Sequence, residues 1–148
     1  MGTPSQGFTG PATPSSQYYV YYPTANGLTA YTLTGIVQML VQGQATGVDF
    51  FRTPFFFDVP IPDLPPGKGL QLVHWAPFVT LNSISNDGVA ENAGWAVDDF
   101  IVLRPEEVSR SVSMQANLAV RDIDGYILRC GYDIHLLGKI SDLPPAPR

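Results

Sequence analysis

The chain has 148 residues, of which 45% are hydrophobic, so it is long enough for one domain with a sizeable core, and disorder of the whole chain is excluded. Only 14% of the residues are charged, against roughly 25% in an ordinary soluble domain. Because charge is depleted at buried interfaces, this predicts a homo-oligomer or a larger assembly, with a monomer of uncharged polar surface as the alternative. The net charge of −5 and the scattered basic residues exclude broad nucleic-acid binding.

The first segment, residues 1–17, consists largely of Gly, Pro, Ser, Thr and Gln. Such a segment buries too little apolar surface to offset the entropy of ordering it, so we expect a flexible arm. Phe8 is its apolar anchor, expected to insert into a neighbouring subunit. The arm has the features of neither a signal peptide nor a myristoylation site. No apolar run reaches the roughly 20 residues of a membrane helix, so we expect no membrane partner.

Two strands are expected after the arm. Residues 18–22 form an aromatic, β-favouring run that leads into an Asn-Gly turn. Over 28–42 apolar and polar residues alternate, which predicts the second strand. A helix over 35–42 is the alternative, because helical spacing also fits there. Flanking glycines and β-branched residues favour the strand.

A phenylalanine-rich stretch, 50–57, precedes a proline-rich one, 60–68. Because proline removes backbone donors from a β-ladder, 60–68 is expected as an extended, polyproline-like connection. Side chains alternate between the faces of a strand, so one sheet face cannot bury three consecutive phenylalanines. Unless both faces are covered, at least one of them packs against a loop, the arm or another chain. The candidate interface residues are Phe8, Phe55, Phe56, Phe57, Pro60 and Pro62.

The middle of the chain is expected to contain three short strands. Two lie within 70–81, on either side of Pro77, because proline interrupts a ladder. A polar loop spans 82–94, and the third strand spans 95–103.

Asp98 and Asp99 are adjacent within the third of these strands. Neighbouring strand residues point to opposite faces, so one carboxylate faces inward or lies at a bulge. The run 94–102 is similar to one strand of jelly-roll carbohydrate-binding and adhesion domains. This resemblance covers a short stretch and identifies no family; it implies a calcium-binding or turn-supporting role for Asp98 or Asp99.

The last third carries the clearest alternation. Apolar residues take every second position over 112–120 and again over 128–136. Two amphipathic strands around a Gly-containing turn predict a β-hairpin. A three-residue loop, 123–125, opposes apolar to apolar residues, for example Val120 to Leu128, whereas a two-residue loop opposes apolar to polar ones. We therefore expect the three-residue loop.

No residue pattern predicts catalysis. His74 and His135 are the only histidines, and their separation fits no metal-binding spacing. Cys130 is the single cysteine, which excludes an intrachain disulfide, and its place in the alternation is inward, where a thiol is inert. The chain contains no nucleophile elbow and no glycine-rich phosphate loop. We expect a protein without enzymatic activity, metal or cofactor.

The expected fold is all-β: an antiparallel, jelly-roll-like β-sandwich or barrel over 18–140, with the extended N-terminal arm 1–17 and a proline-rich tail, 141–148. The leading hypothesis is a structural subunit of a virus or phage capsid, or a decoration protein, that clasps its neighbours. This hypothesis would place the protein in a virion; the sequence itself names no compartment. The alternative is a module that binds carbohydrate or another small ligand by stacking on Trp75, Trp95 and tyrosines. A small β-barrel enzyme without a recognisable motif comes third.

Overall fold

The computed structural model describes residues 13–24, 26–45, 51–86, 94–121 and 123–145. Every regular element in these ranges is a β-strand, which confirms the all-β prediction. The strands are β1 (Thr13–Pro23), β2 (Thr29–Ala45), β3 (Phe51–Pro60), β4 (Lys68–Asn86), β5 (Gly94–Leu103), β6 (Ser111–Arg121) and β7 (Ile123–Asp142).

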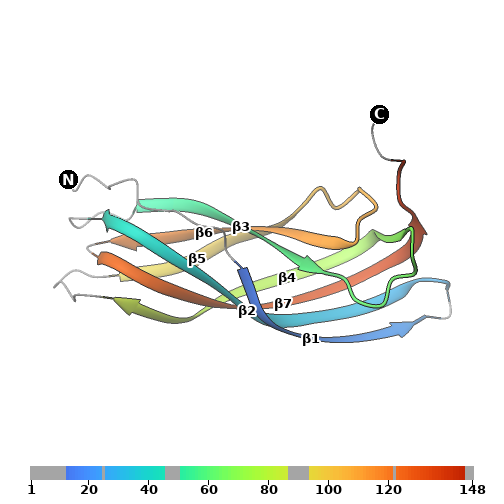
Figure 1. The fold of residues 1–148 in the computed structure, drawn as a ribbon, viewed down its shortest axis with the longest axis horizontal. Helices are drawn as coiled ribbons and strands as arrows, with labels where there is room; N and C mark the ends of the chain where they lie inside the picture. The colour runs from blue at the N-terminus through green and yellow to red at the C-terminus, as the bar shows by residue number, and fades with distance from the viewer. Residues whose placement is uncertain (1–12, 25, 46–50, 87–93, 122, 146–148) are drawn as a thin grey trace.

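The strands form two antiparallel sheets, with the orders β1-β2-β7-β4 and β3-β6-β5. Figure 1 shows them as two layers whose long strands follow the long axis of the molecule. The chain changes sheet between β2 and β3, between β3 and β4, between β4 and β5, and between β6 and β7. Because the two sheets stay separate, the fold is a β-sandwich, one of the two architectures that the sequence predicted.

The core lies between the inner faces of the sheets. Alternate residues of the strands are buried there, because side chains alternate between the two faces of a strand. Phe57 of β3 packs against Tyr132 of β7, with ring centroids 5.7 Å apart, so aromatic rings join the two sheets. The central strands β6 and β7 contribute seven further core residues: Val112, Met114, Ala116 and Leu118 of β6 and Cys130, Ile134 and Leu136 of β7.

The predicted C-terminal hairpin is wrong. β6 pairs with β3 and β5, whereas β7 pairs with β2 and β4, so the two strands lie in different sheets. Cys130 is aligned with Val37 and Leu81 rather than with Leu118. The alternation correctly predicts the residues that face the core, because Leu118 and Cys130 are both buried. Alternation fixes which residues face the core, and two strands that face each other across a sandwich satisfy it as well as two hydrogen-bonded neighbours do.

The two short strands predicted within 70–81 are one long strand, β4. Pro77 lies inside it, aligned with Ile134 of β7. A proline is tolerated there because β4 is an edge strand: among the described strands it has one ladder partner, β7. Register shifts after Leu72 and after Leu81 add further irregularity to this edge. β4 also takes the first part of the segment expected as a polar loop.

The proline-rich connection between β3 and β4 lies where it was expected, but it contains turns rather than one extended run. Asp63 and Gly67 adopt left-handed conformations, with φ of 60° and 73°. The Arg110 guanidinium donates hydrogen bonds to the carbonyl oxygens of Pro65, at 2.9 Å, and Lys68, at 2.6 Å. One side chain thereby ties this connection to the segment that leads into β6.

The strand boundaries extend beyond the expected domain limits at both ends. β1 begins at Thr13, inside the segment expected as the arm, because the backbone of Thr13 to Gln17 is aligned with β2. β7 continues to Asp142, whose carboxylate accepts a hydrogen bond from the Lys68 ammonium of β4. Phe8 lies outside the described residues. In the described ranges there is no helix of the length and apolarity needed to cross a bilayer.

Candidate functional site

The three consecutive phenylalanines of β3 divide between the two faces of its sheet. Phe55 and Phe57 are buried, at 5% and 4% exposure, while Phe56 is 52% exposed on the outer face. Phe56 is aligned with Gln115 of β6, and Gln115 with Ile101 of β5, whose side chain is also exposed. Phe56, Gln115 and Ile101 therefore form one cross-strand row, which we call the outer row.

Polar interactions border the outer row on both sides. On one side, the Ser113 hydroxyl donates a hydrogen bond to the Asp58 carboxylate at 2.7 Å. On the other side, the Asp99 carboxylate lies 3.7 Å from the Arg52 guanidinium and accepts a weak hydrogen bond from Asn117 at 3.5 Å. Two exposed apolar side chains, one on each side of Gln115, thus lie between polar borders, and a polar rim around apolar side chains is found at protein-binding surfaces.

Asp99 lies at a β-bulge. This is one of the two arrangements that we expected for a carboxylate of the adjacent residues Asp98 and Asp99. The register shifts between Asp98 and Ile101, and Asp99 has a φ of 52°. Within the described residues, no group of three or more His, Cys, Asp and Glu side chains is arranged to hold a metal ion. The Asp99 carboxylate instead contacts Arg52 and Asn117 beside the bulge.

A second apolar surface follows β1, which is an edge strand of the larger sheet. Tyr19, Val20, Tyr21 and Tyr22 are all exposed large hydrophobic residues, so apolar side chains emerge on both faces of this strand. On the core-facing side, Tyr21 stacks on the buried Tyr31, with ring centroids 5.5 Å apart. On the same side, the Tyr19 hydroxyl donates a hydrogen bond to the Asp63 carboxylate at 2.9 Å, and this bond raises the pKa of Tyr19.

The exposure of β1 was not predicted from the sequence. The aromatic run indicated a strand, but not whether the strand lies at an edge. The run 16–22 contains neither a charged residue nor a proline, the residues that usually protect an edge strand, so no residue in it indicated an edge.

β4 exposes Val73, Trp75 and Phe78. Trp75 is aligned with the buried Leu136, whereas Phe78 is aligned with the exposed Asp133, so the two aromatic side chains lie on opposite faces of the sheet. Phe78 instead contacts Phe100 of β5, at a centroid distance of 6.2 Å. Trp75 and Phe78 therefore do not form a shared stacking platform.

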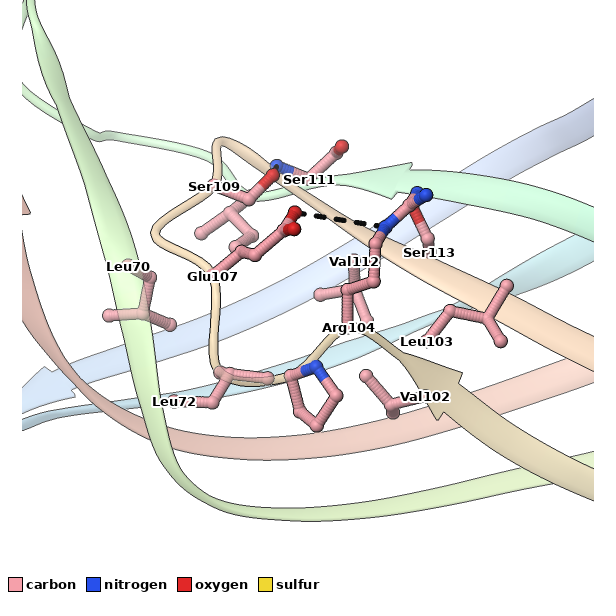
Figure 2. Close-up of a pocket in the computed structure, with 12 residues that line it drawn as sticks. Leu70, Leu72, Val102, Leu103, Arg104, Glu107, Ser109, Ser111, Val112 and Ser113 are labelled. Carbon is pink, nitrogen blue, oxygen red and sulfur yellow. Dashed lines mark hydrogen bonds and ion pairs between the residues drawn. The ribbon is translucent and has the colours of Figure 1, made fainter. Parts of the chain in front are cut away.

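A small pocket opens between β4 and the segment that joins β5 to β6, as Figure 2 shows. Its apolar wall includes Leu70, Leu72 and Val102, and the Arg104–Glu107 ion pair, with a 3.7 Å N–O distance, lies at its rim. The cavity measures about 50 Å³. Ligand pockets for drug-sized molecules measure roughly 300–1,000 Å³. Its volume corresponds to a few water molecules.

The other sequence candidates lie apart from one another. Burial raises the pKa of the Cys130 thiol to about 12, so it is not a nucleophile at neutral pH. His74 is exposed. His135 lies on the outer face, as expected, with Nδ1 at 3.3 Å from the Thr32 hydroxyl and Nε2 at 3.4 Å from the Asp133 carboxylate. Of the candidate interface prolines, Pro60 is exposed and Pro62 is half-buried.

The fold and these surfaces define a two-sheet β-sandwich with apolar rows on its outside. No protein-family model, no curated protein and no solved structure matches this chain.

Proposed function

We propose that the protein is a non-enzymatic structural subunit that packs against neighbouring subunits of a larger assembly. The exposure of Phe56, at the β3 end of the outer row, carries this proposal. Phe56 adds little to the core, yet it presents half of a large aromatic surface to solvent between polar borders. Contiguous exposed apolar surface with a polar rim is characteristic of protein-binding sites.

The energy that Phe56 offers is large enough to anchor a contact. Half of a phenylalanine side chain corresponds to about 100 Å² of apolar surface. At about 25 cal/mol per Å², its burial in a neighbour contributes about 2.5 kcal/mol, which is the size of an interface hot spot. The low charge content of the chain supports the same role, because charged residues are depleted in the centres of interfaces.

A virus or phage shell is the concrete assembly that we propose, with the protein as a capsid-associated or decoration subunit. Double-sheet sandwiches of the jelly-roll type occur in viral capsid proteins and also in lectins. This step is an analogy of fold, and the proposed contact through Phe56 does not depend on it.

The proposal is tested by the mass of the protein in solution as a function of concentration. Phe56→Ser should shift association to at least tenfold higher concentration and leave the melting temperature nearly unchanged. Val73→Ser is the matched control, because Val73 is 58% exposed and lies on β4 of the other sheet. If Phe56→Ser and Val73→Ser associate alike, or if the wild-type protein stays monomeric at every concentration, the proposal is refuted.

A further inference from the structure

Among the described residues the sandwich has four edge strands: β1 and β4 in the larger sheet, and β3 and β5 in the smaller one. The outer side of an edge strand presents unpaired backbone donors and acceptors, which another strand can bind. Proteins prevent such pairing with prolines, bulges, charged residues or a covering loop. The four edges differ in how many of these features they carry.

Three of the four edges are blocked. β4 contains Pro77 and two register shifts, and its start is covered by hydrogen bonds between the backbones of Leu70 and Ser109. β3 contains Pro54 and ends at Pro60. β5 contains the bulge at Asp99. None of these edges offers a long regular ladder to a further strand.

The edge of β1 carries none of these features over most of its length. From Ser16 to Tyr22 it pairs with β2 in unbroken register, with no proline, bulge or charged residue. Among the described residues, no strand pairs with its other side. Figure 1 shows β1 along the lower margin of the larger sheet. The edge is therefore regular and has no charged residue of its own, although the Asp63 carboxylate binds the Tyr19 hydroxyl on the core-facing side; exposed Tyr19, Val20 and Tyr21 flank the edge.

We propose that β1 pairs antiparallel with β1 of a second copy of this chain, which joins two four-stranded sheets into one continuous sheet. This inference rests on the proposed role as an assembly subunit and names one of its contact surfaces. The contact is symmetric, so each copy contributes the same residues. A two-fold axis near Tyr19, the middle of the regular run, allows the whole run to pair.

The features of the edge favour a second copy as the occupant. Of the four described edges, only β1 is regular and neutral, so another β1 is the matching strand that the chain itself supplies. The chain carries a net charge of −5, so two copies repel each other over most of their surfaces. An uncharged strand is where two acidic copies can approach most closely. Aromatic side chains on both faces then form cross-strand pairs, the units that stabilise a sheet.

The first test places like charges at the proposed axis. In Val20→Lys, two lysines lie close together in the paired dimer, and they should raise the dissociation constant at least tenfold, less so in concentrated salt. Val73→Lys is the matched control: the same substitution gives the same net charge at a similarly exposed valine on β4. It should leave the dissociation constant unchanged within twofold. Analytical ultracentrifugation measures both.

The second test is cross-linking through single introduced cysteines. Tyr19→Cys, Val20→Cys and Tyr21→Cys sample positions around the axis, and the buried Cys130 contributes little background. At least one of the three should form a disulfide-linked dimer under mild oxidation, because equivalent residues meet at a two-fold axis. Val73→Cys should not.

The outcomes separate this inference from the proposed function. If Phe56→Ser weakens association while Val20→Lys does not, the assembly role stands and the β1 contact is overturned. If the β1 amides that point away from β2 resist hydrogen exchange in a monomeric sample, a segment of the same chain occupies the edge, which also overturns it. If the wild-type protein stays monomeric and no variant cross-links, both proposals fail.

Discussion

The sharpest test of the described packing is a comparison of two neighbouring phenylalanines in β3. Phe57 is buried, with its ring centroid 6.1 Å from that of Phe55 and 5.7 Å from that of Tyr132. Replacing a buried phenylalanine with alanine removes its transfer free energy and leaves a cavity, which together cost about 3–5 kcal/mol. The lost ring contacts add about 0.5–1.5 kcal/mol, so we expect Phe57→Ala to lower the free energy of unfolding by about 4 kcal/mol or more.

The adjacent residue should respond differently. Phe56 is 52% exposed, so Phe56→Ala removes about half as much buried side-chain surface as Phe57→Ala does, and it leaves no enclosed cavity. We expect a loss of about 1 kcal/mol or less. Equilibrium urea unfolding, followed by tryptophan fluorescence at a concentration where the protein is monomeric, measures both values. Equal losses for the two variants would refute the assignment of Phe56 to the outer face.

Three further outcomes follow from the structure. Thiol reagents should label Cys130 slowly in the native protein and quickly in urea, because its pKa of about 12 falls to about 8.5 on unfolding; rapid labelling of the native protein would contradict its burial. Gly138→Ala should lower the melting temperature, because a Cβ at this position would lie 2.5 Å from the backbone oxygen of Gln71; an unchanged melting temperature would show that the strands separate easily there. The Lys68 ammonium lowers the pKa of Asp142, so this pair stabilises the fold above the ordinary Asp pKa of about 3.9 and loses its effect as the pH falls below it. Urea unfolding should show a small deficit for Lys68→Met at pH 7 that disappears near pH 2, and a deficit that persists at pH 2 would contradict the role of the ion pair.

The sequence predicted which residues face the core far better than which strands pair. Alternation correctly placed Leu118 and Cys130 inward and His135 outward. It could not place β6 and β7 in different sheets, because alternation depends only on the two faces of each strand and carries no information about its hydrogen-bonded neighbour.

The candidate surfaces were predictable to different degrees. Side chains alternate between the faces of a strand, so one face cannot bury Phe55, Phe56 and Phe57 together, and the structure places Phe56 on the outer face. The exposure of Tyr22 was not predictable, because it depends on the position of β1 at a sheet edge. Edge positions are set by strand order, which arises from contacts between distant parts of the chain. For the same reason, Pro77 led to the prediction of two short strands. The proline is in fact tolerated inside the single strand β4, because β4 lies at a sheet edge.

The position of β7 also has a consequence for how the protein folds. β7 is the last strand in chain order, yet it lies between β2 and β4, with Leu33 aligned to Ile134 across most of the chain. Closing such long loops costs entropy before any contact compensates for it, and folding rates fall as contacts become less local. Until β7 arrives, β2 and β4 have no partner between them and their inner edges stay open. We therefore expect slow folding with an aggregation-prone intermediate, in which the timing of the last strand decides between the sandwich and misassembly.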